Sequence, residues 1–183
     1  MDLAHANTSQ NAGKPRLWDW FFLIFLVCAM LGVAWVGWLA FHEGHKTETI
    51  KRHGEAWGKH FAANAVKRGQ DDYPLEACSA KADAKSTWGD CYQALVSPGG
   101  AMDGLVNPFL NAPQKLAPAC NPNDLSLVGA LVLEKLTPTA PGSPVPFVAE
   151  ALSEGDPINQ KLQIRITVCD KGASPIRVGE FEF

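Results

Sequence analysis

The chain has 183 residues, of which 16 are Lys or Arg and 19 are Asp or Glu, so its formal net charge is −3. This balance gives no basic field for a polyanion, and we expect no nucleic-acid partner. All but one of the 13 prolines follow residue 73, which favours a loop-rich C-terminal region over a second helical bundle.

The N-terminal region divides into a tail and an apolar run. We interpret residues 1–17, which are small and polar, as a cytoplasmic tail. Residues 18–41 are predicted to form a transmembrane helix, because the 22 residues from Trp20 to Phe41 include no charge. At about 1.5 Å per residue, such a run crosses a hydrocarbon core of roughly 30 Å. It exceeds the apolar core of a signal peptide, and no A-x-A cleavage site follows, so we expect the anchor to be retained.

Several side chains of this span are candidates for helix packing. Small residues four apart, such as Cys28 and Gly32, let helices approach closely. Tryptophans collect at membrane interfaces, which suits Trp18 and Trp20 at the inner side. Trp35 and Trp38 suit either the outer interface or a neighbouring helix.

Residues 42–69 are predicted to continue the helix as an amphipathic stalk, because they lack proline and end at Gly69. Ile50, Trp57 and Phe61 recur at spacings of 7 and 4, with Ala65 four residues further, and so share one helical face. Two interpretations are open: the stripe packs on the chain's own head domain, or it packs against another subunit.

The stalk also carries four of the five histidines, at positions 42, 45, 53 and 60. His42 and His45 are three residues apart, one fewer than in the H-E-x-x-H motif of zinc hydrolases. They would need a further ligand from elsewhere to hold a metal or pigment, and His42 at the end of the span is the position to inspect. We expect no metal and no cofactor.

Residues 70–183 are predicted to form an extracytoplasmic head domain that is rich in β-structure. Residues 88–96 suit a short helix, and turn-rich connectors follow, with Asn-Pro twice and Pro-Gly-Gly. Four strands are expected at residues 127–136, 145–152, 161–169 and 175–183. Their connections have no room for crossover helices, so the sheet should be antiparallel and the fold α+β.

The strand at 161–169 alternates most clearly, with Leu162, Ile164, Ile166 and Val168 on one face. The last strand loses this phase after Val178. A β-bulge at Gly179 would restore its later apolar residues to the core side. Pro146 places the start of the second strand at an edge of the sheet.

Four cysteines lie after the span, at positions 78, 91, 120 and 169. An even number in a small extracytoplasmic domain suggests two disulfides, with three possible pairings. We favour Cys78–Cys91 and Cys120–Cys169. The C-x₂₋₄-C pairs of zinc sites are missing.

No catalytic motif is present: the sequence has no G-x-S-x-G, no G-x-x-x-x-G-K and no G-x-G-x-x-G. The acidic residues suit solvated turns and strand faces. We therefore expect a non-enzymatic protein without a small-molecule substrate or catalytic residues.

The order of a membrane helix, an amphipathic stalk, a connector with the turn Asn107-Pro108-Phe109, and a disulfide-linked antiparallel sheet resembles that of type IV pilins. The resemblance covers residues 17–183 and implies a pilin-like head and assembly through protein contacts. The prepilin-peptidase site of that family is missing, because Gly13 is followed by Lys14 and Pro15 and the span contains no glutamate.

These features predict a single-pass structural or interaction protein of a bacterial inner membrane. Lys and Arg are more numerous after the span than before it, but a long domain is translocated regardless of such charges. The cysteines therefore place the N-terminus in the cytoplasm and the head in the periplasm. Expected partners are the lipid bilayer and either copies of the chain or other membrane subunits. The alternative function is an accessory subunit of a respiratory or photosynthetic complex.

Overall fold

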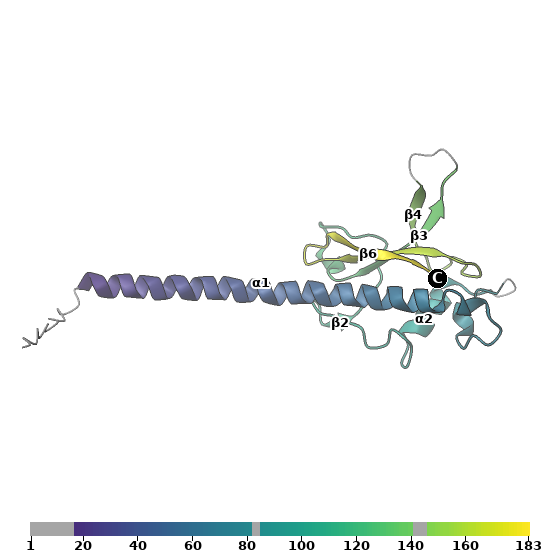
Figure 1. Ribbon diagram of the computed structural model, residues 1–183, viewed down its shortest axis with the longest axis horizontal. Helices are drawn as coiled ribbons and strands as arrows, with labels where there is room; N and C mark the ends of the chain where they lie inside the picture. The colour runs from purple at the N-terminus through teal and green to yellow at the C-terminus, as the bar shows by residue number, and fades with distance from the viewer. Residues whose placement is uncertain (1–16, 82–84, 141–145) are drawn as a thin grey trace, which may run out of the picture. The chain divides into compact units, whose positions relative to one another are not determined.

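The computed structural model describes residues 17–81, 85–140 and 146–183. The chain divides into two compact units, Met1–His42 and Glu43–Phe183 (Figure 1). The expected cytoplasmic tail lies outside the described residues except for Leu17, and so does Val145 at the start of the second expected strand.

Helix α1, Leu17–Asn64, begins in the first unit and ends in the second. Its first part has no proline and satisfies its backbone hydrogen bonds internally, as a segment in hydrocarbon must. Among the described residues it is the one helix that is long and apolar enough to cross a membrane, judged by length and composition. The expected end near Gly69 is wrong by five residues, because a separate 3₁₀ turn, η1 (Lys67–Gly69), follows the helix.

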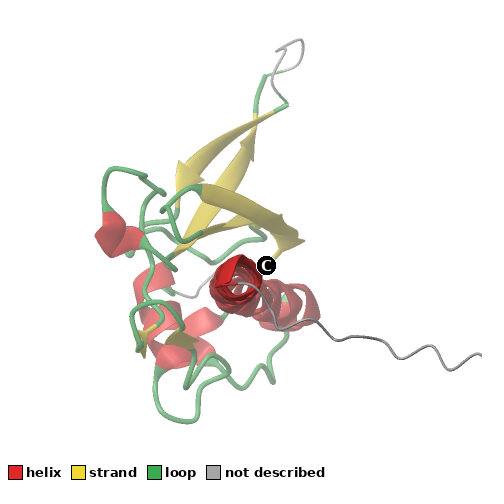
Figure 2. Cartoon of the chain, turned by 90° about the vertical axis from the view of Figure 1, so that its left-hand side faces the viewer, coloured by secondary structure: helices red, strands yellow, loops and turns green. Residues whose placement is uncertain are grey.

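The second unit contains a four-stranded antiparallel sheet in the order β4-β3-β5-β6 (Figure 2). The strands are β3 (Leu131–Pro138), β4 (Phe147–Ala151), β5 (Gln163–Cys169) and β6 (Pro175–Glu182). The predicted α+β class is confirmed, and β4 is an edge strand as Pro146 indicated. Residues 127–130 do not belong to β3 because a 3₁₀ turn, η3 (Leu125–Leu127), and Gly129 at φ +70° precede it.

The bulge expected near Gly179 is present in β6. Ile166 pairs with Gly179, whereas Thr167 pairs with Arg177, which leaves Val178 as the additional residue. Val178 and Phe181 both pack against the core, and Phe183 is fully buried in it. The bulge therefore returns the apolar side chains of β6 to the face that meets α1, as the change of phase required.

The part of α1 in the second unit packs on this face of the sheet. Ile50, Trp57 and Phe61 are at most 1% exposed. Gly54 and Gly58 lie between them: a Cβ on Gly54 would be 2.8 Å from Cγ2 of Val178, and one on Gly58 would be 2.3 Å from the Phe181 ring. The two glycines thus let the helix backbone approach β6 more closely than any side chain would permit.

Shorter elements cover the other side of α1. Helix α2, Trp88–Val96, has the predicted bounds. Thr87 is its N-cap, and Oγ1 of Thr87 accepts a hydrogen bond from the backbone amide of Asp90. A 3₁₀ turn, η2 (Glu76–Cys78), precedes it. Strands β1 (Val106–Asn107) and β2 (Ala112–Pro113) form a small hairpin in a region expected to be a connector.

Both favoured disulfides are present. Cys78–Cys91 joins η2 to α2, and Cys120–Cys169 joins a loop to the end of β5. The chain-entropy model assigns them about 3 and about 4 kcal/mol of stabilisation for loops of these lengths. Each disulfide fixes an irregular segment to a regular element: η2 to α2, and the loop at Cys120 to β5.

A substitution at Gly58 tests the close contact between α1 and β6. We expect Gly58→Ala to lower the free energy of unfolding of the full chain in detergent by about 2 kcal/mol, because the new methyl group meets the Phe181 ring. Gly44→Ala is the matched control: Gly44 lies in the same helix with no heavy atom within 4 Å of its Cβ position. It should be neutral or stabilising by up to about 1 kcal/mol.

Chemical denaturation followed by tryptophan fluorescence measures both variants. Phe181→Leu should partly restore the stability of Gly58→Ala by removing the clash. Equal stability of the two glycine variants would show that the ring moves aside and that the close approach is not required.

Candidate functional site

The apolar part of α1, Leu17–Phe41, is the candidate interaction surface. None of these residues is buried in the first unit. The four tryptophans that sequence analysis singled out are exposed by 55–83%: Trp18, Trp20, Trp35 and Trp38. A continuous apolar surface of this extent is typical of a segment covered by lipid or by another protein.

The small residues of this segment are open. Cys28 is exposed and unbonded, and Gly32 has no heavy atom within 4 Å of its Cβ position. Trp35 and Trp38 lie next to each other with ring centroids 5.9 Å apart, and the Trp38 ring contacts His42 edge-on at 4.5 Å. The segment therefore has a low point at Gly32 and a cluster of rings towards its C-terminal end.

The three stalk residues proposed for helix packing lie elsewhere. Ile50, Trp57 and Phe61 are buried within their own domain, where Phe61 contacts Phe183 at a centroid distance of 4.5 Å and Trp57 stacks beside Tyr92 at 6.0 Å. The first of the two interpretations of the stripe therefore holds. These side chains cannot contact another subunit without unfolding the core.

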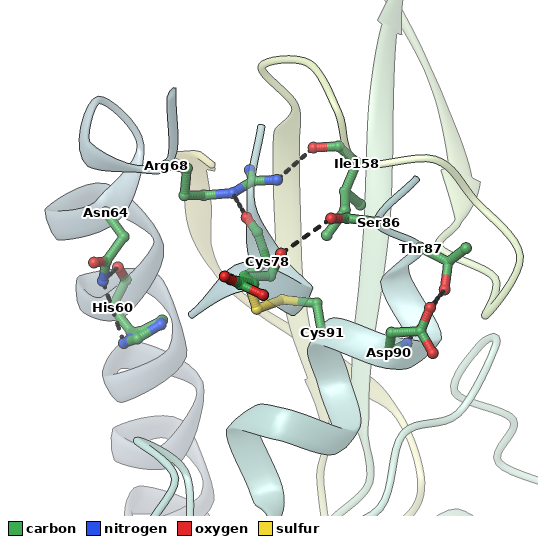
Figure 3. The surroundings of a disulfide bond; sticks show 10 residues. His60, Asn64, Arg68, Cys78, Ser86, Thr87, Asp90, Cys91 and Ile158 are labelled. Atoms are coloured by element: carbon green, nitrogen blue, oxygen red, sulfur yellow. Dashed lines mark hydrogen bonds between the residues drawn. A yellow bond between two sulfur atoms is a disulfide. The ribbon is translucent and has the colours of Figure 1, made fainter. Parts of the chain in front are cut away.

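A buried arginine follows the end of α1 (Figure 3). Arg68 is 0% exposed; its Nε donates to the carbonyl of Cys78 and one terminal nitrogen donates to the carbonyl of Ile158, both at 2.5 Å. Its guanidinium lies 3.7 Å from the centre of the Phe183 ring. Burial lowers the pKa of Arg68 to about 10, against a smaller opposing effect of Tyr73. The side chain therefore stays charged at neutral pH.

The geometry gives Arg68 a positioning role rather than a chemical one. It holds the disulfide loop at Cys78, the segment at Ile158 and the end of the sheet at Phe183 to a single point. Its other terminal nitrogen, Nη1, is buried without a hydrogen-bond partner in the described part of the chain. The two carbonyls and the ring face stabilise the charge in the place that a carboxylate often takes.

His60 forms a smaller polar contact on the same helix. The side-chain amide nitrogen of Asn64 donates to the His60 carbonyl at 2.8 Å and lies 3.4 Å from Nδ1 of the His60 ring (Figure 3). The contact favours the neutral ring with its proton on Nε2, and burial lowers the pKa of His60. His60 has no nucleophile or carboxylate beside it among the described residues, so the contact is structural.

One apolar cavity of about 280 Å³ lies between α1, α2 and the β1–β2 hairpin. Its walls are formed largely by Trp57, Tyr92, Met102, Leu105 and Leu131. Its polar lining is already engaged, because Gln114 donates to the Gly129 carbonyl and contacts Nδ1 of His53. The cavity brings together no nucleophile and base.

In residues 17–81, 85–140 and 146–183, no group of three or more His, Cys, Asp or Glu side chains lies close enough to hold a metal ion. His42 contacts the Trp38 ring, and the His45 carbonyl accepts a hydrogen bond from Thr49.

Three residues that set the packing were not predicted from the sequence: Gly54, Gly58 and Arg68. Gly54 and Gly58 continue the spacing of Ile50, Trp57 and Phe61, so their position on the buried face was visible in the pattern. Arg68 carried no such signal, because its burial depends on segments 10 and 90 residues away.

A scan against protein-family models, a search of curated proteins and a search of solved structures each gave no match.

Replacing Arg68 tests its positioning role. We expect Arg68→Ala to lower the free energy of unfolding by about 3 kcal/mol, because it leaves two buried carbonyls without donors. Arg52→Ala is the control: the exposed Arg52 pairs only with Glu48 across one helical turn, and its loss should cost less than about 0.5 kcal/mol. Similar denaturation midpoints for the two variants would contradict the role.

The burial of His60 predicts a dependence of stability on pH. Because the pKa is lower in the folded state, the unfolded chain binds the proton first, and stability is lost as pH falls below about 6.5. Denaturation between pH 8 and pH 5 should therefore show a decline that His60→Gln reduces and His45→Gln, at an exposed position, retains. Asp156 does not contribute in this window: burial would raise its pKa, but hydrogen bonds from Lys135 and Ser153 outweigh this and lower it.

Proposed function

We propose that this chain is a non-enzymatic, single-pass membrane-anchored structural or interaction protein of pilin-like architecture. The observation that carries the proposal is the division of α1 into two surfaces. Its second part uses Ile50, Trp57 and Phe61 to hold the sheet, whereas Leu17–Phe41 has all its side chains exposed. A helix of this kind attaches a folded domain to the lipid or protein that covers its exposed part.

The two disulfides support placing Glu43–Phe183 on the periplasmic side of a bacterial inner membrane. Disulfides form and persist in oxidising compartments and are rare in the cytosol. Both bonds are in the second unit, whereas the one unbonded cysteine, Cys28, is in the apolar segment. The N-terminus would then be cytoplasmic.

A second candidate is an accessory subunit of a larger membrane complex. The observation that favours it is the exposure of Trp18, Trp20, Trp35 and Trp38 in one short segment, together with the missing prepilin-peptidase site. Tryptophans are common at the centres of protein interfaces, where large rings fill pockets of the partner. In this case α1 would dock on unrelated subunits and the head would cap them.

Extraction in mild detergent, followed by identification of co-purifying chains and imaging of the particles, separates the two candidates. Homopolymeric fibres would exclude the accessory subunit, and a stoichiometric complex with unrelated subunits would exclude the filament. A monomer that retains no partner would contradict both.

A substitution at Gly32 locates the contact. We expect Gly32→Leu to reduce recovery of the partner or of self-assembled particles at least tenfold, because a large side chain fills the low point at which a second helix approaches. Val33→Leu, at a neighbouring exposed position, is the matched control and should retain assembly. Equal recovery with both variants would place the contact on another face of α1.

A further inference from the structure

The domain Glu43–Phe183 has few exposed large apolar side chains. In its described part they are Val66, Val106, Leu110, Leu125 and Val148. Val66 follows the end of α1 and Val148 lies in the edge strand β4. The other three belong to the β1–β2 hairpin and to η3, two loops that are separate in sequence.

Contacts between side chains and backbone groups bring these loops to one end of the domain. Lys46 lies over the Phe109 ring at 5.8 Å, which places the tip of the hairpin beside the first helical turn of the domain. Within the hairpin, the Asn107 amide donates to the Val128 carbonyl at 2.7 Å, which joins it to the η3 loop.

The β5–β6 turn reaches the same place. Lys171 in this turn forms an ion pair with Glu43. The Gly129 amide donates to the Cys169 carbonyl at 2.9 Å, so the turn and the η3 loop are also joined. The hairpin and the β5–β6 turn therefore contact residues 43–46 of α1, and the η3 loop is joined to both.

The hairpin and the sheet both run along α1 towards the first helical turn of the domain, at Glu43 and Lys46. Gln114 at the base of the hairpin contacts His53, whereas Phe109 at its tip contacts Lys46. Lys46 and His53 are seven positions apart in α1, which corresponds to about 10 Å along the helix. Val168 lies close to Gly54 while Lys171 reaches Glu43, a displacement of about 16 Å in the same direction.

This end is also the one nearest the apolar segment along the chain. Lys46 follows Phe41 by only five residues in the sequence. We propose that the end of the domain formed by the three loops rests on the bilayer, with Leu110 and Leu125 in the headgroup region. The inference depends on the proposed membrane anchor.

The chemistry of this end suits lipid better than a second protein. Leu110 and Leu125, the exposed large apolar side chains at this end of the described domain, offer far less area than the roughly 800 Å² per partner of a stable protein interface. A domain already held at the membrane needs only a small apolar patch to rest there. The charges around the loops are mixed, with Lys46, Lys115 and Lys171 against Glu43, Asp124 and Asp170. Contact should therefore be insensitive to ionic strength.

Site-directed spin labelling of the full chain in phosphatidylcholine–phosphatidylglycerol nanodiscs tests the inference. Single labels are introduced by Leu110→Cys, Leu125→Cys, Val66→Cys and Val148→Cys in a Cys28→Ser background, because the other four cysteines form disulfides. A label on Cys28 of the unmodified chain reports on the apolar segment. All four introduced sites are exposed, so their substitution disturbs no buried contact.

The measured quantity is the ratio of collision rates with oxygen, which partitions into lipid, and with a water-soluble nickel chelate. We expect ratios at positions 110 and 125 at least threefold above those at positions 66 and 148, in low and in high salt.

Each other outcome overturns the inference in a distinguishable way. Water-like ratios at positions 110 and 125 with a lipid-like ratio at Cys28 reject the head contact and leave the anchor in place. Low collision rates with both reagents at positions 110 and 125 mean that protein covers them, which replaces the bilayer by a second copy or another subunit. Water-like ratios at every position, Cys28 included, reject the anchor and the head contact together.

Discussion

The second unit depends on the contact between one face of α1 and strands β5 and β6. Gly54 and Gly58 let the helix backbone approach the sheet, and Ile50, Trp57 and Phe61 fill the space on either side. Full burial of each large apolar side chain is worth roughly 1.5–3 kcal/mol, so this face supplies much of the free energy that offsets the ordering of a loop-rich domain. The bulge in β6 contributes to this contact, because it keeps both Val178 and Phe181 on the face of the sheet that meets the helix.

The irregular segments are attached to this centre by a small number of specific groups. Arg68 joins the disulfide loop, the segment at Ile158 and the Phe183 ring, and Asn107 joins the hairpin to the η3 loop. Each of these side chains is buried and satisfies backbone carbonyls that no strand or helix would otherwise satisfy. Together with two disulfides, they allow long turn-rich stretches to keep one conformation without much regular structure.

The same helix thus serves two environments. In the second unit its apolar side chains are buried in the domain's own core. The stripe of Ile50, Trp57 and Phe61 is therefore not accessible to a partner. The exposed residues of Leu17–Phe41 and the loops around residues 43–46 are what remain for lipid or protein to cover.

The sequence by itself determined the elements whose signals are local. The uncharged run from Trp20 predicted a long apolar helix, which is present. The alternation of residues 161–169 and the loss of phase near Gly179 follow from the period of a strand, and they predicted β5 and the bulge in β6. The cysteine spacing favoured the pairing that is present. Tertiary structure alone decided between the two interpretations of the stalk stripe, since burial depends on what lies opposite. It also decided the burial of Arg68, the hairpin at residues 106–113, and the contacts of this hairpin and of the β5–β6 turn with Lys46 and Glu43. These features arise from contacts between segments far apart in the chain, for which a single sequence carries no periodic signal.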